Sequence, residues 1–443
     1  MTQQHFRENR TRTLALVLIL TMGGIIVWEF SSHHETPLDA MRKKGYPVTL
    51  AELNAWYKPV PEAQNNARFY EEAFALPVLR NLEEIPWLER GRALFVEDRK
   101  ELSELLVTNQ LALRLLHSAQ ATNRCRYSED LNKLLSAYQN PGFRVLNGVR
   151  LLAIEALLHA ADGDSQQATS SFLAAGTLAD SFAEEPSVIS QILRGACWRV
   201  LVRRLEHGIA LTQMTEEQLA SLQRMVVQAE RPEALLRGLV GEQAMGIAAF
   251  ADAFNVMEYA RQPASLSVRL KDSLLIGLSK TTGAFERDRK FYLDCIEKSV
   301  AAASLPFPER LKLGLQIPNP RAAPRYSMMT AILLPKLAEL FASEADTTAR
   351  LRSAQMALAV ERFRRRHEGR LPARLEELVP DYCKAVPVDL FDGKQLRFRT
   401  FASGYVIYSI GPDGRDDDGA EPDPNNSQAP HDIGFKVEWD EPL

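Results

Sequence analysis

The helical spacing of apolar residues between Thr49 and about Leu340 most constrains the fold of this chain. One helical hairpin is clear. An apolar helix is predicted at Val145–Ala161, and the turn-forming sequence Asp162-Gly163-Asp164 follows it. A second helix then repeats apolar residues every three or four positions, at Ala168, Phe172, Ala175, Ala179 and Phe182. We expect the two helices to pack together in a mainly α fold.

Further helix signals follow in tandem. Ser187 can cap the next helix, Thr215 and Gln218 form a capping box, and Arg231-Pro232 marks a break. The tandem hairpins resemble helical-repeat proteins of the tetratricopeptide kind over about one repeat. No period of roughly 34 residues carries that family's Trp, Leu-Gly and Tyr positions. Residues 49–340 are therefore predicted to form an irregular α-hairpin array.

A membrane anchor is predicted near the start of the chain. Thr13–Trp28 is sixteen residues without a charge, and Arg7, Arg10 and Arg12 precede it. At 1.5 Å per residue it spans about 24 Å, short of the roughly 30 Å hydrocarbon core, so a cleaved signal peptide is the alternative. The only cleavage site, after Ser32, is a poor one.

We expect residues 1–12 to be a cytoplasmic tail, 13–30 a transmembrane helix in the lipid bilayer and 31–48 a linker. Basic residues before the apolar segment favour a single-pass protein whose bulk is extracytoplasmic.

The pattern changes after residue 340. An amphipathic helix is predicted at Arg350–His367 and a helical turn at Leu375–Leu378. Strands at Leu396–Thr400 and Tyr405–Ser409 flank Ala402-Ser403-Gly404 as a hairpin, and Ile433–Trp439 alternates as a further strand. Residues 341–443 are thus predicted to be an α+β domain with a small antiparallel sheet.

This last quarter resembles the periplasmic domain of the major pseudopilin of type II secretion, in the bacterial pilin superfamily. The resemblance rests on several short motifs in the family's order: Glu361-Arg362-Phe363, His367–Pro372, Leu375–Pro380, Val386–Asp389 with Asp392-Gly393, Tyr408–Gly414, and Asp432-Ile433. It implies a calcium-binding loop with Asp413 and Asp432 as ligands and Ser409 as a carbonyl donor. Roughly 330 residues of other protein precede the domain, so we do not expect it to polymerise into a pilus.

The loop 411–432 supports calcium independently of the resemblance. The segment Ser409–Leu443 holds ten acidic residues against Arg415 and Lys436, whereas the whole chain has a net charge of −4. Calcium takes six to eight oxygen ligands, which a loop rich in Asp, Asn and Gly supplies. The predicted metal ligands are Ser409, Asp413, Asp416, Asp418 and Asp432. The alternative is a solvated acidic loop that binds no metal.

Other chemistry has little support in the sequence. Nucleophile-elbow, zincin, Walker and dinucleotide-binding motifs are absent, the four cysteines are widely spaced, and the mild negative charge gives no reason to expect nucleic acid. His33-His34 is interpreted as linker and Cys197 as a small buried residue. Arg362 and Arg364–Arg366 are predicted to lie on the solvated face of a helix.

Two functions remain open. The first is a binding or assembly protein, anchored in the inner membrane of a bacterium, with a calcium-stabilised pseudopilin-like module and a protein or envelope assembly as its partner. The second is an extracytoplasmic enzyme whose site is built from scattered residues of the helical domain. Convergent titratable side chains with perturbed pKa values in a pocket would favour the enzyme, and a smooth groove would favour binding.

Overall fold

The computed structural model describes residues 37–76, 96–119, 124–128, 131, 142–260, 266–320, 323–324, 327–421 and 431–439. It is mainly helical and contains one small antiparallel sheet, as the sequence predicts. The chain divides into two compact units, Met1–Val48 and Thr49–Leu443. In the first unit the described part holds helix α2 (Pro37–Lys43).

The predicted anchor at 13–30, the tail before it and His33-His34 lie outside the described residues. Among the helices that are described, none combines the length and the apolar character needed to cross a bilayer.

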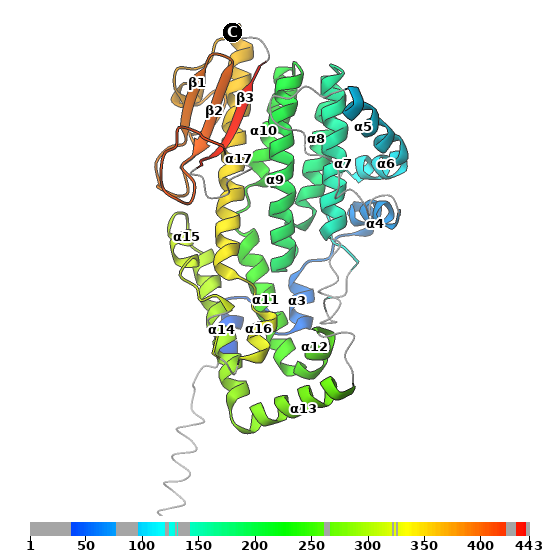
Figure 1. Cartoon of the computed structure of the whole chain (residues 1–443), viewed down its shortest axis with the longest axis vertical. Coiled ribbons are helices and arrows are strands. Elements are labelled where there is room, and N and C mark those ends of the chain that lie inside the picture. Colours follow the sequence, from blue (N-terminus) through cyan, green and yellow to red (C-terminus); the bar gives the residue numbers. More distant parts are fainter. Residues whose placement is uncertain are drawn as a thin grey trace, which may run out of the picture. The chain divides into compact units, whose positions relative to one another are not determined.

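The second unit contains the remaining described helices (Figure 1). Three short 3-10 turns, η1 (Glu62–Gln64), η5 (Asp180–Phe182) and η7 (Leu375–Leu378), accompany them. The helices are α3 (Leu50–Trp56), α4 (Ala67–Ala75), α5 (Val96–Thr108), α6 (Gln110–Ser118), α7 (Gly142–Ala161), α8 (Ser165–Ala179), α9 (Val188–Leu211), α10 (Glu216–Ala229), α11 (Ala234–Ala251), α12 (Ala253–Ala260), α13 (Leu266–Thr281), α14 (Ala284–Ala303), α15 (Glu309–Gly314), α16 (Met328–Leu333) and α17 (Leu337–Arg366).

The predicted hairpin is confirmed as α7 and α8, which pack closely against each other and against α9. Gly163 has a φ of +79°, and the Asp164 side chain accepts a hydrogen bond from the backbone N–H of Gln167. The capping box of Thr215 and Gln218 is also present at the start of α10. Local signals therefore set these helix ends.

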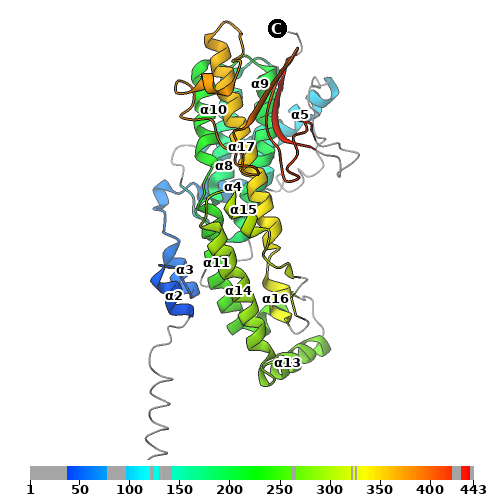
Figure 2. The same ribbon diagram turned by 90° about the vertical axis from the view of Figure 1, so that its left-hand side faces the viewer.

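Helix α17 joins the helical array to the C-terminal residues. It is 30 residues long and packs against α9 and α10 on one side and strands β2 and β3 on the other (Figures 1 and 2). The sequence predicts only its second half, from Arg350. The helix begins earlier because Leu337, Leu340 and Phe341 continue the buried face towards its N-terminus. The expected domain boundary at residue 340 therefore falls inside α17.

The sheet has the order β1-β2-β3, with β1 (Arg397–Phe401), β2 (Gly404–Ser409) and β3 (Ile433–Glu438). Both neighbouring pairs are antiparallel, as predicted. On the face against α17, Tyr405 is fully buried and its hydroxyl donates to the Ala357 carbonyl oxygen at 3.1 Å. One hydrophobic core runs from the hairpin helices through α17 to Phe435 and Val437 of the sheet.

The prediction that the arginines near the end of α17 are solvated is wrong for Arg362 and Arg364. Their side chains are each 17% exposed and form ion pairs with Glu216 and Glu361. Arg362 crosses to α10, where it also donates to the side-chain oxygen of Gln223 at 2.7 Å. The Arg362 pair therefore joins two helices that are far apart in the sequence, whereas the Arg364 pair lies within α17.

Candidate functional site

In the described part of the chain, a cavity lies where the helical array meets the C-terminal residues. It has a volume of about 380 Å³, in the range of small-molecule sites. Its walls come from α9, the α10–α11 junction, α15 with the turn before it, α17 and the loop at residues 388–390. Most of the wall is apolar, and the larger apolar side chains are Ile192, Leu235, Phe307, Leu340, Leu351 and Leu390.

Four arginines are prominent among the polar side chains of this cavity. On α9, Arg194 is 8% exposed, and its guanidinium donates to Asp180 and to the Ala229 carbonyl oxygen, at 2.6 Å in each case. Arg310, 5% exposed, donates to the Pro232 carbonyl oxygen at 3.0 Å and to Glu344 at 2.7 Å. Buried guanidinium groups need such partners, and here the partners also fix their positions.

Two more arginines complete the polar wall. Arg231 pairs with Asp180 at 2.7 Å, and Arg352 donates to Glu230 at 3.1 Å and to the Val388 carbonyl oxygen at 2.6 Å. The four guanidinium groups thus pair with the carboxylates of Asp180, Glu184, Glu230 and Glu344, and Asp389 also lines the wall. The charges of the wall are therefore close to balance, and an anionic ligand depends on guanidinium donors that these carboxylates leave without a hydrogen bond.

Two guanidinium nitrogens are left over in this arrangement. Among the described residues, Nη1 of Arg194 and Nη2 of Arg310 make none of the hydrogen bonds that hold these side chains. Neither nitrogen is among the buried polar atoms that lack a hydrogen-bond partner. Both nitrogens belong to side chains that line the cavity, so they are the candidate donors for a carboxylate there.

Glu344 is the carboxyl group of the described cavity wall with a perturbed pKa. Burial raises its pKa to about 7, and the attraction of Arg310 opposes that rise. Its second carboxylate oxygen, Oε2, is buried and has no hydrogen-bond partner among the described residues. Protonation near neutral pH would therefore increase the positive charge of the wall.

The cavity was not predicted from the sequence. Its residues run from Gln191 to Leu390, so no local motif contains them. The only signal was the density of arginine and glutamate in otherwise apolar helices, and that pattern is also typical of solvated helix faces.

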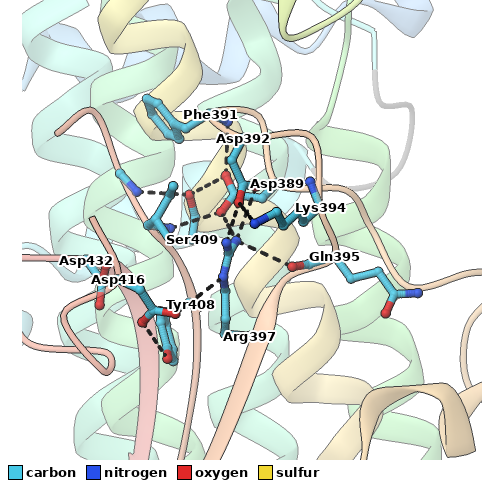
Figure 3. A network of polar contacts seen from close by, with 12 residues as sticks. Asp389, Phe391, Asp392, Lys394, Gln395, Arg397, Tyr408, Ser409, Asp416 and Asp432 are labelled. Atoms are coloured by element: carbon cyan, nitrogen blue, oxygen red, sulfur yellow. Dashed lines mark hydrogen bonds and ion pairs between the residues drawn. The ribbon is translucent and has the colours of Figure 1, made fainter. Parts of the chain in front are cut away.

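The predicted metal ligands lie in and beside the acidic loop, where their side chains have different hydrogen-bond partners. Ser409 is fully buried, and its hydroxyl donates to Asp389 Oδ1 at 2.7 Å (Figure 3). Asp389, 1% exposed, also accepts from the Ile410 backbone N–H at 2.9 Å and pairs with Arg397. The Asp389–Arg397 pair was not predicted from the sequence. It links the start of β1 to the segment that precedes the hairpin. The Ser409 side chain belongs to this network.

The other predicted ligands have separate partners. Asp413 is exposed and accepts from the Arg415 backbone N–H at 3.1 Å. Asp416 accepts from the Tyr408 hydroxyl at 3.0 Å, and the Asp418 side chain is 79% exposed. Within the described part of the chain, no three acidic, histidine or cysteine side chains are grouped as a metal site. Residues 422–430 of the loop lie outside that part.

Asp432 is the predicted ligand whose surroundings fit a cation. It is 2% exposed, and its Oδ2 accepts from the backbone N–H groups of Gly419 at 2.7 Å and Asp417 at 3.1 Å. Its Oδ1 and the Oδ2 of Asp417 are both buried without a hydrogen-bond partner among the described residues. Buried carboxylate oxygens require hydrogen bonds or a cation, so these two fit a metal ion.

The cysteines give no nucleophile. Cys197 is fully buried, as predicted, and burial raises the pKa of its thiol to about 12. The four cysteines are free thiols, and burial raises the pKa of each. A thiol with a raised pKa is a poor nucleophile near neutral pH.

Comparisons of the chain with protein-family models, with curated proteins and with solved structures found no match.

Proposed function

We propose that this chain is a membrane-anchored, extracytoplasmic binding protein of a bacterial inner membrane, and that its cavity holds a carboxylate attached to an apolar body. The observation that carries the proposal is that one cavity combines a largely apolar wall with guanidinium nitrogens of Arg194 and Arg310 that make no hydrogen bond among the described residues. The carboxylate can belong to a small amphiphile or to the end of a partner protein chain.

An enzyme is the second candidate, and Glu344 is the observation that favours it. A carboxyl group with a pKa of about 7 suits general acid or base catalysis. The described cavity wall offers no histidine, cysteine or second carboxyl group with a raised pKa to act with it. Glu344 also already pairs with Arg310, so its arrangement supports charge balance in a binding site better than proton transfer.

The C-terminal residues form the second part of the proposal. The order of α17, η7, the hairpin and the last strand agrees with the expected pseudopilin-like module. We propose that calcium stabilises its acidic loop, with Asp432 and Asp417 as carboxylate ligands and the carbonyl oxygens of the loop as further donors. The buried, unpartnered oxygens of these two residues support this role. The metal would supply positive charge and no reaction step.

Calorimetry on the detergent-solubilised full chain tests the binding function. The probes are decanoate and an acetylated leucine tripeptide with a free carboxylate, and the corresponding amides are neutral controls. Binding of either carboxylate without binding of its amide is expected. Thr348→Phe should abolish binding, because it fills the cavity, and the lost Thr348 hydroxyl donates to the Glu344 carbonyl oxygen of its own helix.

Arg289→Gln is the matched control, because Arg289 is 47% exposed and pairs with Glu286 away from the cavity wall. Equal heats for acids and amides, or full binding by Thr348→Phe, would contradict the proposal. Decanoate binding alone points to a small amphiphile, and binding of the tripeptide alone points to a partner chain.

A further inference from the structure

Helix α13 presents leucines to solvent. Leu270, Leu274 and Leu278 are 58%, 73% and 62% exposed, and their spacing of four residues places them in one stripe along the helix. Asp272 and Ile276 lie on the opposite face and are buried. The usual arrangement of a surface helix, with apolar residues inside and polar residues outside, is thus partly reversed.

The position of α13 suits contact with a flat surface. It lies crosswise at one end of the second unit, and the three-stranded sheet lies at the opposite end (Figures 1 and 2). Helix α13 packs against α12 and α14, and the three exposed leucines lie on its other face. The unit begins with α3, which packs on α11 in the same half of the unit as α13.

The sequence around the stripe is rich in basic residues, of which Arg269 pairs with Glu258 and Arg289 with Glu286. Residues 266–290, which include α13 and the start of α14, hold six basic and three acidic residues. Two of the acidic residues, Asp272 and Asp288, are buried. Exposed lysine and arginine beside an apolar stripe are typical of helices that lie in the interface of an anionic membrane.

We propose that α13 lies in the headgroup region of the bilayer, with Leu270, Leu274 and Leu278 inserted among the acyl chains of anionic lipids. The inference rests on the proposed anchor, which keeps the second unit near the membrane. About 19 residues join Phe30 to Thr49, and they limit how far the end carrying α3 can move from the bilayer.

Fluorescence quenching on the full chain in vesicles of phosphatidylethanolamine and phosphatidylglycerol tests this inference. An environment-sensitive fluorophore is attached to Thr281→Cys, which is exposed beside the stripe, in a Cys125→Ser background. Lipid-borne spin labels near the headgroup should quench it more strongly than labels near the acyl end. The same fluorophore on Ala402→Cys, in the exposed β1–β2 turn, is the control and should not be quenched.

Replacing the three leucines by serine should remove the quenching without unfolding the chain, because these side chains are exposed. If the fluorophore on Thr281→Cys is not quenched when the three leucines are present, the inference is overturned. Crosslinking between copies through Leu274→Cys, without quenching, shows instead that a second copy covers the stripe. Retention of the chain in the membrane after carbonate extraction tests the anchor separately. A chain that is retained but shows no quenching contradicts the role of α13 and leaves the proposed anchor standing.

Discussion

Buried glutamates are the residues whose ionisation most affects this fold. Burial raises the pKa values of Glu185, Glu242 and Glu344 to about 7. A group whose pKa is higher in the folded than in the unfolded state stabilises the fold when protonated. Its contribution is full below the unfolded value, near 4.5, and is lost as the pH rises through about 7.

Glu242→Gln isolates this effect, because burial is the only cause of the shift at Glu242. We expect the variant to gain stability over the wild type between pH 5 and pH 8, by up to about 3 kcal/mol. Denaturant unfolding at several pH values measures the difference. Glu286→Gln, whose side chain is 65% exposed, should follow the wild type. Parallel stability curves for wild type and Glu242→Gln would show that Glu242 is ionised in the folded state at neutral pH.

Glu344 makes ligand binding depend on pH. Protonation near pH 7 removes a negative charge beside Arg310, so decanoate should bind more tightly at pH 6 than at pH 8.5. We expect at least a fivefold difference in Kd, about 1 kcal/mol. Glu344→Gln should bind at both pH values as tightly as the wild type does at pH 6. Titration calorimetry at the two pH values checks this, and tighter binding at pH 8.5 would be inconsistent with the assigned role of Glu344.

The sequence predicts single residues well only where their environment is local. Cys197 could be predicted as buried because its own helix is apolar. Arg362 could not be predicted as paired, because its partner Glu216 is 146 positions away. One sequence contains no information about such a distant partner.

At the scale of elements, the close packing of α11 depends on glycine. A Cβ at Gly241 would lie 1.8 Å from the Pro186 carbonyl oxygen, which is backbone and has little room to move. Gly241→Ala should therefore cost at least about 2 kcal/mol of unfolding free energy. Gly277→Ala in α13 meets nothing within 4 Å and should stabilise its helix by about 0.5–1 kcal/mol. Chemical denaturation of both variants measures these effects, and equal stabilities would show that the α11 contact is looser than described.

The acidic loop is the element in which calcium should act. The full chain should melt at a higher temperature in calcium than in chelator, since a ligand at a hundredfold excess over Kd adds about 2.7 kcal/mol. Asp432→Asn should remove the difference, and Asp418→Asn should largely retain it because that side chain is exposed. Magnesium should substitute poorly, because it prefers a tighter octahedral site. Coincident melting curves with and without calcium would identify the stretch as a solvated loop.

Secondary structure was the most predictable level. The hairpin α7–α8, the capping box and all three strands follow from periodicity, turn residues and caps, which act over a few positions. The early start of α17 was missed, because its first half is held by packing against other helices. Among the predicted metal ligands, Asp432 has a buried carboxylate oxygen without a hydrogen-bond partner in the described part of the chain, and the Ser409 hydroxyl donates to Asp389.

At the scale of the whole molecule, α17 makes the array and the C-terminal residues one structure. Arg352 and Arg362 tie α17 to α10, and the Gln223 side chain of α10 donates to the Tyr382 carbonyl oxygen at 3.0 Å. The cavity forms at this junction and takes residues from both parts. Its existence depends on tertiary packing, which is why the helices were predictable and the cavity was not.

The location of a bound carboxylate tests the central claim most directly. A crystal structure of the full chain with 10-bromodecanoate would locate the bromine by anomalous scattering. We predict that the bromine lies among Leu235, Phe307 and Leu351, with the carboxylate within hydrogen-bond distance of Arg194 or Arg310. The density should be absent from Thr348→Phe crystals. Bromine bound only outside this cavity, or an equally occupied site for the neutral amide, would contradict the account.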